Sequence, residues 1–202
     1  MHTNEHPGAT QHHRAFVISA GWTLSLLLLG SIVHATESSL ACPDWPTCFG
    51  SYMPLMEGGV FWEHIHRLWA GGLMLLFMLG TWFAWREGAS RRVRIGATVG
   101  VGLLLVQATL GGLTVIMRLP DAISTSHLSM ALAFLVLTTV LALATSPKRP
   151  LRNRLPESAR RTLRRWGTAS AALVFGQSVV GGLVRHTDAG MACPDVPTCG
   201  GQ

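Results

Sequence analysis

The chain has 202 residues, of which 49% are hydrophobic and only 13% are charged, and its formal net charge at pH 7 is +6. The apolar residues form long uninterrupted blocks, a pattern that excludes an ordinary water-soluble domain and indicates a membrane protein. The positive charge does not indicate a nucleic-acid partner, because the Lys and Arg residues gather in a few segments between the apolar blocks.

Five apolar blocks are long enough to cross a hydrocarbon core of about 30 Å as α-helices. Each is expected to be helical, because a lone strand would leave its backbone unpaired in lipid. We therefore predict an all-α membrane protein, in which an antiparallel four-helix transmembrane bundle is followed by a fifth transmembrane helix. The blocks cover about residues 15–35, 66–85, 95–117, 122–145 and 167–184.

The Lys and Arg residues predict the orientation of these helices. If the five helices cross the membrane in succession, thirteen of the sixteen lie on the same side of it. The positive-inside rule therefore places the N-terminus in the cytoplasm and both cysteine-containing segments outside the cell. The predicted parts are a cytoplasmic tail (1–14), the bundle (15–146) with an outer loop (36–62), a basic cytoplasmic loop (147–166), and the fifth helix with an outer tail (167–202).

One seventeen-residue segment occurs twice. Residues 34–50 read HATESSLACPDWPTCFG and residues 185–201 read RHTDAGMACPDVPTCGG, with nine identical positions. Each copy follows an apolar block, so the chain contains an internal repeat. The Glu- and His-bearing segment after the first copy has no counterpart after the second, because the sequence ends at Gln202. We therefore expect the fifth helix to begin an incomplete second repeat.

Each copy carries two cysteines with the same spacing, Cys42 with Cys48 and Cys193 with Cys199. On the oxidising side of a membrane such a pair most simply forms a disulfide, which for so short a loop stabilises the fold by roughly 2 kcal/mol. A structural staple and a redox-active pair that meets a thiol carrier are both open interpretations. A cross-pairing of Cys42 with Cys199 is also open, whereas the spacing disfavours zinc.

The second apolar block opens with the polar run WEHIHRLW, at residues 62–69. Titratable groups at a membrane boundary are costly and indicate a function. Helical spacing places Glu63 and His66 on one face, in a shared pocket, and His64 roughly opposite. The fourth block carries His127 near the same boundary.

The second and fourth helices of a four-helix bundle can lie diagonally across its core. His66 and His127 would then approach one central plane from opposite sides, which is the geometry of bis-histidine haem ligation. A hydrogen-bonded interface histidine is the alternative for His127, and we expect His34, His64 and His186 to be interface residues. The pattern Gln-x3-Gly-Gly-Leu occurs at 107–113 and again at 177–183, which relates the third and fifth helices.

Five motifs together resemble the bacterial heme A synthase family of the cytochrome oxidase assembly pathway, over essentially the whole chain. They are LACPDWPTC, EHIHR, Q-x3-GGLTV, SHLSMA and GGLVRHTDAGMACPDVPTC. The resemblance implies two fused four-helix bundles in the bacterial inner (plasma) membrane, each holding a haem between two histidines. It also implies oxidation of the C8 methyl group of heme O to the formyl group of heme A, with haem b as a further resident haem.

The resemblance implies roles for individual residues. Glu63 corresponds to a catalytic glutamate, and His66 and His127 correspond to ligands of the haem iron. Cys42 and Cys48 correspond to an extracytoplasmic cysteine pair. A carboxylate beside a bound haem can accept protons or stabilise positive charge as a methyl group is oxidised. Pairing with an arginine one helical turn further on is the alternative for this glutamate.

The resemblance also predicts a second haem-binding bundle, which this sequence does not contain. The expected partners are therefore the haem substrate, a second copy of the chain or a separately encoded second half, and heme O synthase or oxidase assembly factors. Three other functions stay open: a non-catalytic haem carrier, a b-type cytochrome, and a thiol-disulfide membrane protein. Only the last requires neither His66 nor His127, and only the synthase requires Glu63.

Overall fold

The computed structural model describes residues 9–147, 155–187, 189–193 and 199. These residues form α-helices and one short 3₁₀ helix, with no β-strand among them, so the predicted all-α fold is confirmed. Each of the five α-helices is long and apolar enough to cross a membrane. The elements are α1 (Gln11–Ala35), α2 (Gly58–Arg86), α3 (Arg91–Ile116), α4 (Asp121–Ala144), α5 (Glu157–His186) and η2 (Ala189–Met191).

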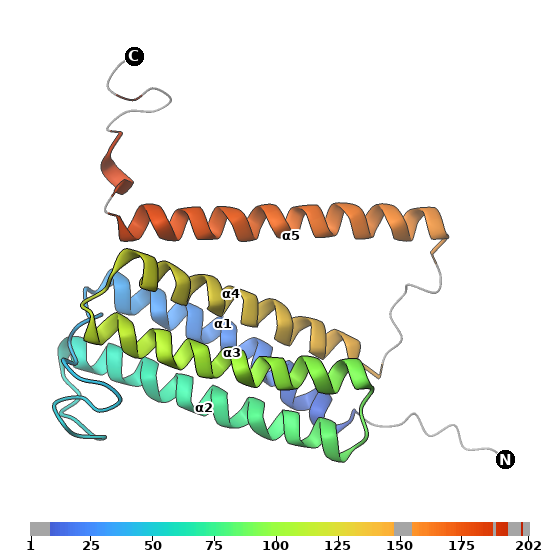
Figure 1. Cartoon of the computed structure of the whole chain (residues 1–202), viewed down its shortest axis with the longest axis horizontal. Coiled ribbons are helices and arrows are strands. Elements are labelled where there is room, and N and C mark those ends of the chain that lie inside the picture. Colours follow the sequence, from blue (N-terminus) through green and yellow to red (C-terminus); the bar gives the residue numbers. More distant parts are fainter. Residues whose placement is uncertain (1–8, 148–154, 188, 194–198, 200–202) are drawn as a thin grey trace.

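Helices α1 to α4 form a bundle in which consecutive helices run antiparallel (Figure 1). Helix α1 packs against α2 and α4, and α3 packs against the same two helices. Helices α2 and α4 therefore lie diagonally across the bundle and run parallel, which confirms the arrangement expected from the sequence. Helix α5 lies outside the bundle, beside α4.

Two helices begin earlier than the apolar blocks indicated. Helix α2 begins at Gly58, so His66 is its ninth residue, and α5 begins at Glu157, ten residues before the apolar block. Both extensions carry charged or polar residues that interrupt the apolar pattern on which the sequence prediction depended. The basic residues of 160–165 thus belong to α5. Four other basic residues (148, 149, 152 and 154) lie outside the described residues, as do five of the nine positions that are identical in the two repeat copies (194, 195, 197, 198 and 201).

Three phenylalanines fill the centre of the bundle. Phe16 on α1, Phe77 on α2 and Phe134 on α4 are at most 2% exposed. The ring centroid of Phe77 lies 5.6 Å from that of Phe16 and 4.9 Å from that of Phe134. Gly100 lets α3 approach this stack, because a Cβ atom there would lie 2.5 Å from Cζ of Phe77. This core joins all four helices of the bundle.

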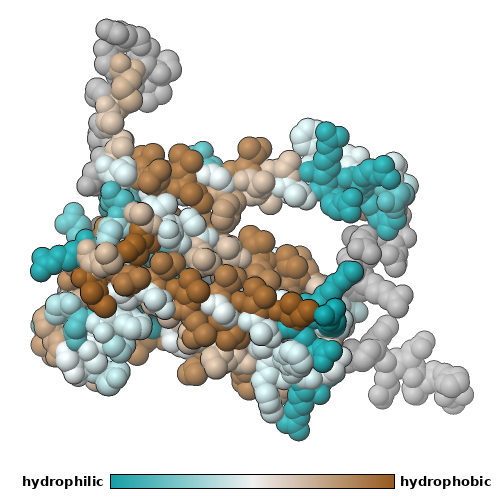
Figure 2. All heavy atoms as spheres, in the orientation of Figure 1, coloured by the Kyte–Doolittle hydropathy of each residue, from teal (hydrophilic) through white to brown (hydrophobic). Residues whose placement is uncertain are grey.

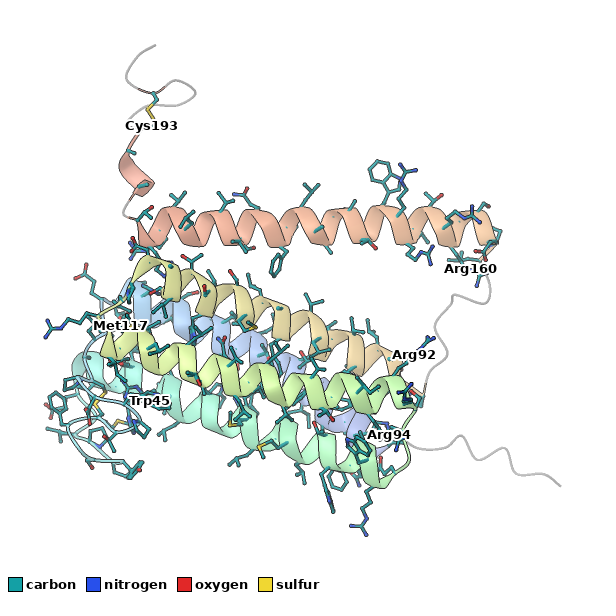
Figure 3. The ribbon with its side chains drawn as sticks, viewed as in Figure 1. Trp45, Arg92, Arg94, Met117, Arg160 and Cys193 are labelled. Atoms are coloured by element: carbon teal, nitrogen blue, oxygen red, sulfur yellow. A yellow bond between two sulfur atoms is a disulfide. The ribbon has the colours of Figure 1, made fainter. Side chains whose placement is uncertain are left out.

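The surface of the described residues is apolar over the helices and polar at their ends. Hydrophobic side chains cover the middle of the visible face, whereas hydrophilic ones gather at both ends (Figure 2). The basic side chains of Arg92, Arg94 and Arg160 lie at one end of the molecule, and Trp45 and Cys193 lie at the other (Figure 3). The two cysteine segments therefore share one end of the molecule.

The N-terminus of α1 is held by the turn after α2. The carboxylate of Glu87 accepts hydrogen bonds from the backbone N–H groups of Gln11 (3.3 Å) and His12 (3.5 Å) and contacts Nδ1 of His12 at 2.5 Å. A carboxylate at this position satisfies free N–H groups and complements the helix dipole. Burial by itself would raise the pKa of Glu87, but the hydrogen bonds from His12 and Gln11 outweigh it and hold that pKa below its ordinary value.

Candidate functional site

His66 and His127 lie near the same end of the bundle on its two diagonal helices. His66 is the ninth residue of α2, and His127 is the seventh residue of α4. Because α2 and α4 run parallel, the two imidazoles lie at similar depth in the bundle. Their approach to one central plane from opposite sides stays a prediction.

Each of these imidazoles rests against a glycine on the neighbouring helix. A Cβ atom at Gly30 of α1 would lie 3.2 Å from Cε1 of His66, and one at Gly111 of α3 would lie 3.1 Å from Cε1 of His127. Any larger residue at either position would push the ring away. The two glycines therefore fix the positions of the two rings in equivalent ways.

Both imidazoles keep buried ring nitrogens without a partner. Nδ1 of His66 and Nδ1 of His127 make no hydrogen bond to the described residues. Nε2 of His127 has only a long contact, 3.4 Å, with the side-chain amide of Gln107, which also donates to the backbone oxygen of His127 at 3.0 Å. Buried polar atoms are normally hydrogen-bonded, so both rings have hydrogen-bonding capacity that the described residues do not satisfy.

Glu63 lies beside the first cysteine loop. The side chain is 5% exposed, and Oε2 accepts a hydrogen bond of 2.8 Å from the backbone N–H of Cys42. Oε1 forms an ion pair with Arg67. The pairing with Arg67 that the sequence left as an alternative is therefore present, whereas His66 turns towards Gly30 of α1. The carboxylate joins α2 to the loop.

Arg67 completes this attachment. Its Nη1 donates hydrogen bonds of 2.7 Å to the backbone oxygens of Asp44 and Thr47, while its Nη2 pairs with Glu63. A guanidinium group has several donors in a rigid plane, and here they span the loop and the helix together. The first cysteine loop is thus held on α2 by charged groups that are largely shielded from solvent.

Disulfides join Cys42 to Cys48 and Cys193 to Cys199. The pairing is therefore within each copy of the repeat, and the cross-pairing of Cys42 with Cys199 does not occur. Inside the first loop, Asp44 accepts hydrogen bonds from the Thr47 hydroxyl (2.5 Å) and from the backbone N–H of Gly50 (2.9 Å). The hydrogen bond from Thr47, supported by that from Gly50, lowers the pKa of Asp44 below its usual value.

His64 faces the same loop. The residue is 3% exposed, and one ring nitrogen and the sulfur atoms of Cys42 and Cys48 all lie within 4.8 Å of one another. Its Nε2 lies 3.0 Å from the backbone oxygen of Tyr52. Glu63 and His64 therefore both face the cysteine loop, although helical spacing alone placed His64 roughly opposite Glu63.

Trp45 at the tip of the loop packs on α3. A Cβ atom at Gly112 would lie 2.8 Å from Cδ2 of the Trp45 ring, next to the glycine that receives His127. The adjacent glycines 111 and 112 thus accept one ring from α4 and one from the loop. The loop covers this end of the bundle, with the tryptophan pointing towards the helices (Figure 3).

The other histidines that we expected at the interface meet at the outer ends of α1 and α5. Nε2 of His34 lies 3.4 Å from Nε2 of His186, and Nδ1 of His186 lies 3.2 Å from the hydroxyl of Thr125. These contacts help to hold α5 on the bundle.

Sequence reasoning did not identify the neighbours of the candidate ligands. The contact of Gln107 with His127 and the glycines beside the two rings were not predicted. One signal was present: Gln107 and Gly111 lie four residues apart on one helix face, so both can reach the same ring on α4. In the sequence this spacing indicated only that the third and fifth helices are related, through the repeated Gln-x3-Gly-Gly-Leu pattern.

The fold and the site together define a multi-pass helical membrane protein that presents two histidines from diagonal helices beneath a disulfide-closed loop. Residues 13–202 match the model of a family described as cytochrome oxidase assembly protein. The chain belongs to this family, as its sequence motifs indicated.

Individual relatives agree with this assignment. The chain is 29% identical to a heme A synthase of Shewanella oneidensis, over 92% of this chain and 60% of that protein. It is 31% identical to a heme A synthase of Lysinibacillus sphaericus, over 94% of this chain and 64% of that protein. It is also 32% identical to a protoheme IX farnesyltransferase of Halobacterium salinarum, over 67% of this chain and 29% of that protein. The chain thus spans about three fifths of the length of the heme A synthases that it matches.

Proposed function

We propose that this chain acts as a heme A synthase-type membrane oxidoreductase, which converts heme O to heme A by oxidising the C8 methyl group for cytochrome oxidase biogenesis. The observation that carries the proposal is the pair of imidazoles on diagonal, parallel helices, with His66 as the ninth residue of α2 and His127 as the seventh residue of α4. The heme A synthases among its relatives support the same reaction.

In this proposal His66 and His127 hold the haem iron, and Gly30 and Gly111 keep their rings in place. When bound, the haem supplies the redox chemistry. To ligate through Nε2, His127 gives up its long contact with the Gln107 amide, which keeps its shorter bond to the backbone of the same residue. Trp45 and the cysteine loop restrict access of water from the outer end of the bundle.

Glu63 has the proposed role of a proton acceptor during oxidation of the methyl group. The ion pair with Arg67 and the hydrogen bond from the backbone N–H of Cys42 hold this carboxylate in place, and a positioned carboxylate can act as a general base. Accepting that proton weakens the pair with Arg67. The guanidinium then stays bound to the backbone oxygens of Asp44 and Thr47.

The setting of the reaction is part of the proposal. The basic end of the bundle faces the cytoplasm and the cysteine loops face outward across the inner membrane of a bacterium, in accordance with the distribution of charge. Heme O and heme A are the substrate and product, and haem b is a further candidate for the resident haem. The partners are a second copy of the chain or a separate second half, together with oxidase assembly factors. Its likeness to part of a protoheme IX farnesyltransferase supports a partner, such as heme O synthase, that also handles haem.

The pigment of the purified protein tests the ligand assignment. We expect a low-spin haem spectrum from the chain purified in detergent, and heme O or heme A on extraction and chromatography. Replacing His66 or His127 with Ala should abolish the spectrum, whereas the matched change His186→Ala should leave it unchanged. Protein without pigment after haem supplementation, or full pigment in both ligand variants, would contradict the proposal.

A non-catalytic haem carrier is the second candidate, and the environment of Glu63 favours it. Both carboxylate oxygens already serve the structure, one on Cys42 and one on Arg67. Production of heme A by cells supplied with heme O separates the two functions. An oxidoreductase should lose most of its product in Glu63→Gln, which keeps the shape of the side chain but removes its charge. Equal production by wild type and variant would remove the catalytic role of Glu63, and absence of product from a fully haem-loaded wild type would favour the carrier.

A further inference from the structure

A second cluster of donor atoms lies above the histidine pair, in the first cysteine loop. One ring nitrogen of His64 and the Sγ atoms of Cys42 and Cys48 lie within 4.8 Å of one another. The two cysteines are 0% exposed and His64 is 3% exposed. Among the described residues this is the one cluster of three His, Cys, Asp or Glu donors close enough to share a metal ion.

The hydrogen bonding of His64 prepares one nitrogen for a ligand. Nε2 faces the backbone oxygen of Tyr52 at 3.0 Å, and because a carbonyl oxygen only accepts, Nε2 carries the hydrogen. In the neutral ring, Nδ1 then has a free lone pair. This atom is buried and makes no hydrogen bond to the described residues. Histidines that bind metals commonly donate their other N–H group to a backbone carbonyl in this way.

The loop has anchors that do not depend on the disulfide. Arg67 holds the backbone oxygens of Asp44 and Thr47, and Glu63 holds the N–H of Cys42. These bonds fix the loop backbone next to each cysteine. Opening the sulfur–sulfur bond therefore leaves two thiols near each other and near His64, which is the preorganisation that a small metal site requires.

Cys48 is buried but lies beside a groove at the surface. Cys48 forms part of the wall of a surface groove of about 490 Å3, whose other walls include Phe49, Met53 and Val60. When the loop moves, a dithiol reductant in this groove can attack the Cys48 sulfur, which forms a mixed disulfide and releases Cys42 as thiolate. Attack by the second thiol of the reductant then releases Cys48. The disulfide gains two electrons and the dithiol loses two as it closes to its own disulfide.

We propose that reduction of the Cys42–Cys48 disulfide turns this loop into a binding site for one monovalent copper ion, held by both cysteine sulfurs and by Nδ1 of His64. Binding releases the two thiol protons and changes no oxidation state. Two thiolates and an imidazole form a soft ligand set. Three donors suit monovalent copper, whereas structural zinc almost always takes four ligands. The site is separate from the His66 and His127 pair, and the inference does not depend on the proposed haem chemistry.

The second cysteine pair provides an internal control. Cys193 and Cys199 have the same spacing and also form a disulfide, but both are exposed and no histidine among the described residues forms a cluster with them. We therefore predict no comparable site there. The variant Cys193→Ser/Cys199→Ser keeps only the proposed site, and Cys42→Ser/Cys48→Ser keeps only the control pair.

The experiment is a titration of the full chain in detergent with monovalent copper under anaerobic conditions, against a chromogenic chelator, before and after reduction with a dithiol. We expect the Cys193→Ser/Cys199→Ser variant to bind one equivalent after reduction and none before it. Adding His64→Ala should weaken binding at least about tenfold, since even outer-shell partners of metal ligands contribute about 10- to 100-fold. The matched change His186→Ala should have no effect.

Wild-type protein gives a readout that does not depend on variants. Bound copper should protect Cys42 and Cys48, but not Cys193 and Cys199, from alkylation after reduction, as measured on peptides by mass spectrometry. The proposal is overturned if reduced protein binds no copper, if Cys42→Ser/Cys48→Ser retains the equivalent, or if a folded His64→Ala variant binds as tightly as its parent. Stoichiometric zinc that displaces the copper would overturn the choice of metal.

Discussion

Helices α1 and α5 each lead into a copy of the same cysteine motif, yet their surroundings differ. Helix α1 packs against both α2 and α4 and buries six residues, whereas α5 packs against α4 and buries only Gly182 among its described residues. The first disulfide is buried and the second is exposed. The motif by itself therefore specifies a disulfide, and the helix that packs beneath it determines its environment. For the first copy that helix is α2, through Glu63, His64 and Arg67.

Replacing Arg67 should produce the largest difference in stability between the first cysteine loop and the region of α5. Replacing it with Ala leaves the carboxylate of Glu63 buried without its partner and frees two backbone oxygens of the loop. We expect a loss of about 3–5 kcal/mol in stability, the range for breaking a buried ion pair. Thermal unfolding in detergent, followed by circular dichroism, measures the loss. The control is Arg185→Ala on the exposed end of α5, and an equal loss in both variants would show that the first loop is not specially anchored.

A larger side chain in place of a glycine should cost less stability than the loss of Arg67, and it should do so in the bundle but not in α5. A Leu at Gly100 must displace Phe77 and Leu137, which a Cβ atom alone would approach to 2.5 and 3.2 Å. Overpacking of this kind typically costs about 1–3 kcal/mol. Gly102 on the same helix and Gly176 on α5 have no atom within 4 Å of the corresponding position. Leu at these two positions should therefore leave the unfolding temperature unchanged or raise it, and a loss like that of Gly100→Leu would contradict the packing difference.

The two disulfides should differ in their rate of reduction. Cys193 and Cys199 are open to solvent, whereas the buried Cys42–Cys48 pair reacts only after the loop moves. A local opening free energy of about 1.4 kcal/mol would slow the buried pair about tenfold. Graded treatment with dithiothreitol followed by alkylation and peptide mass spectrometry measures both rates in one sample. Reduction of the first pair at the same rate as the second would mean that the loop opens freely.

The smallest expected difference in stability is between the N-termini of α1 and α5. The pKa of Glu87 is held below its ordinary value of 4.5, so its stabilisation of α1 is fully present above about pH 4.5 and is lost as the pH falls through the lowered pKa. Glu87→Gln should remove this part of the acid dependence of the unfolding temperature. Glu157 at the start of α5 pairs with Arg160 at the surface, and Glu157→Gln should change stability by no more than about 0.5 kcal/mol. An unchanged acid limb in Glu87→Gln would exclude the capping role.

The helices could be predicted because they depend on properties that are local in the sequence, whereas their diagonal order around the bundle was taken from the family resemblance. Long apolar blocks predict membrane-spanning helices, and successive crossings of a membrane make consecutive helices antiparallel. The depth of His66 and His127 follows from their positions in two parallel helices. The family resemblance rested on short motifs spread over the whole chain, and it is confirmed.

The contacts of individual side chains could not be predicted in the same way. The spacing of α2 indicated that Glu63 and His64 point in different directions, but not that the cysteine loop folds over both. Placement of Trp45 on Gly112 depends on a loop whose path the sequence pattern does not specify. The early starts of α2 and α5 escaped prediction because charged or polar residues interrupt the apolar pattern there.

The contacts at the start of α1 have a consequence for synthesis of the protein. In its first turn, His12 contacts Glu87, which lies 75 residues later in the sequence. The ring of His13 contacts the backbone oxygen of Ala142, which lies 129 residues later. Although α1 leaves the ribosome before α2, α3 and α4, its first turn cannot make all of its native contacts until α4 has also emerged. Closure of the bundle is therefore a late, post-insertion event, and a nascent chain arrested before Ala142 should expose the first turn of α1 to a protease.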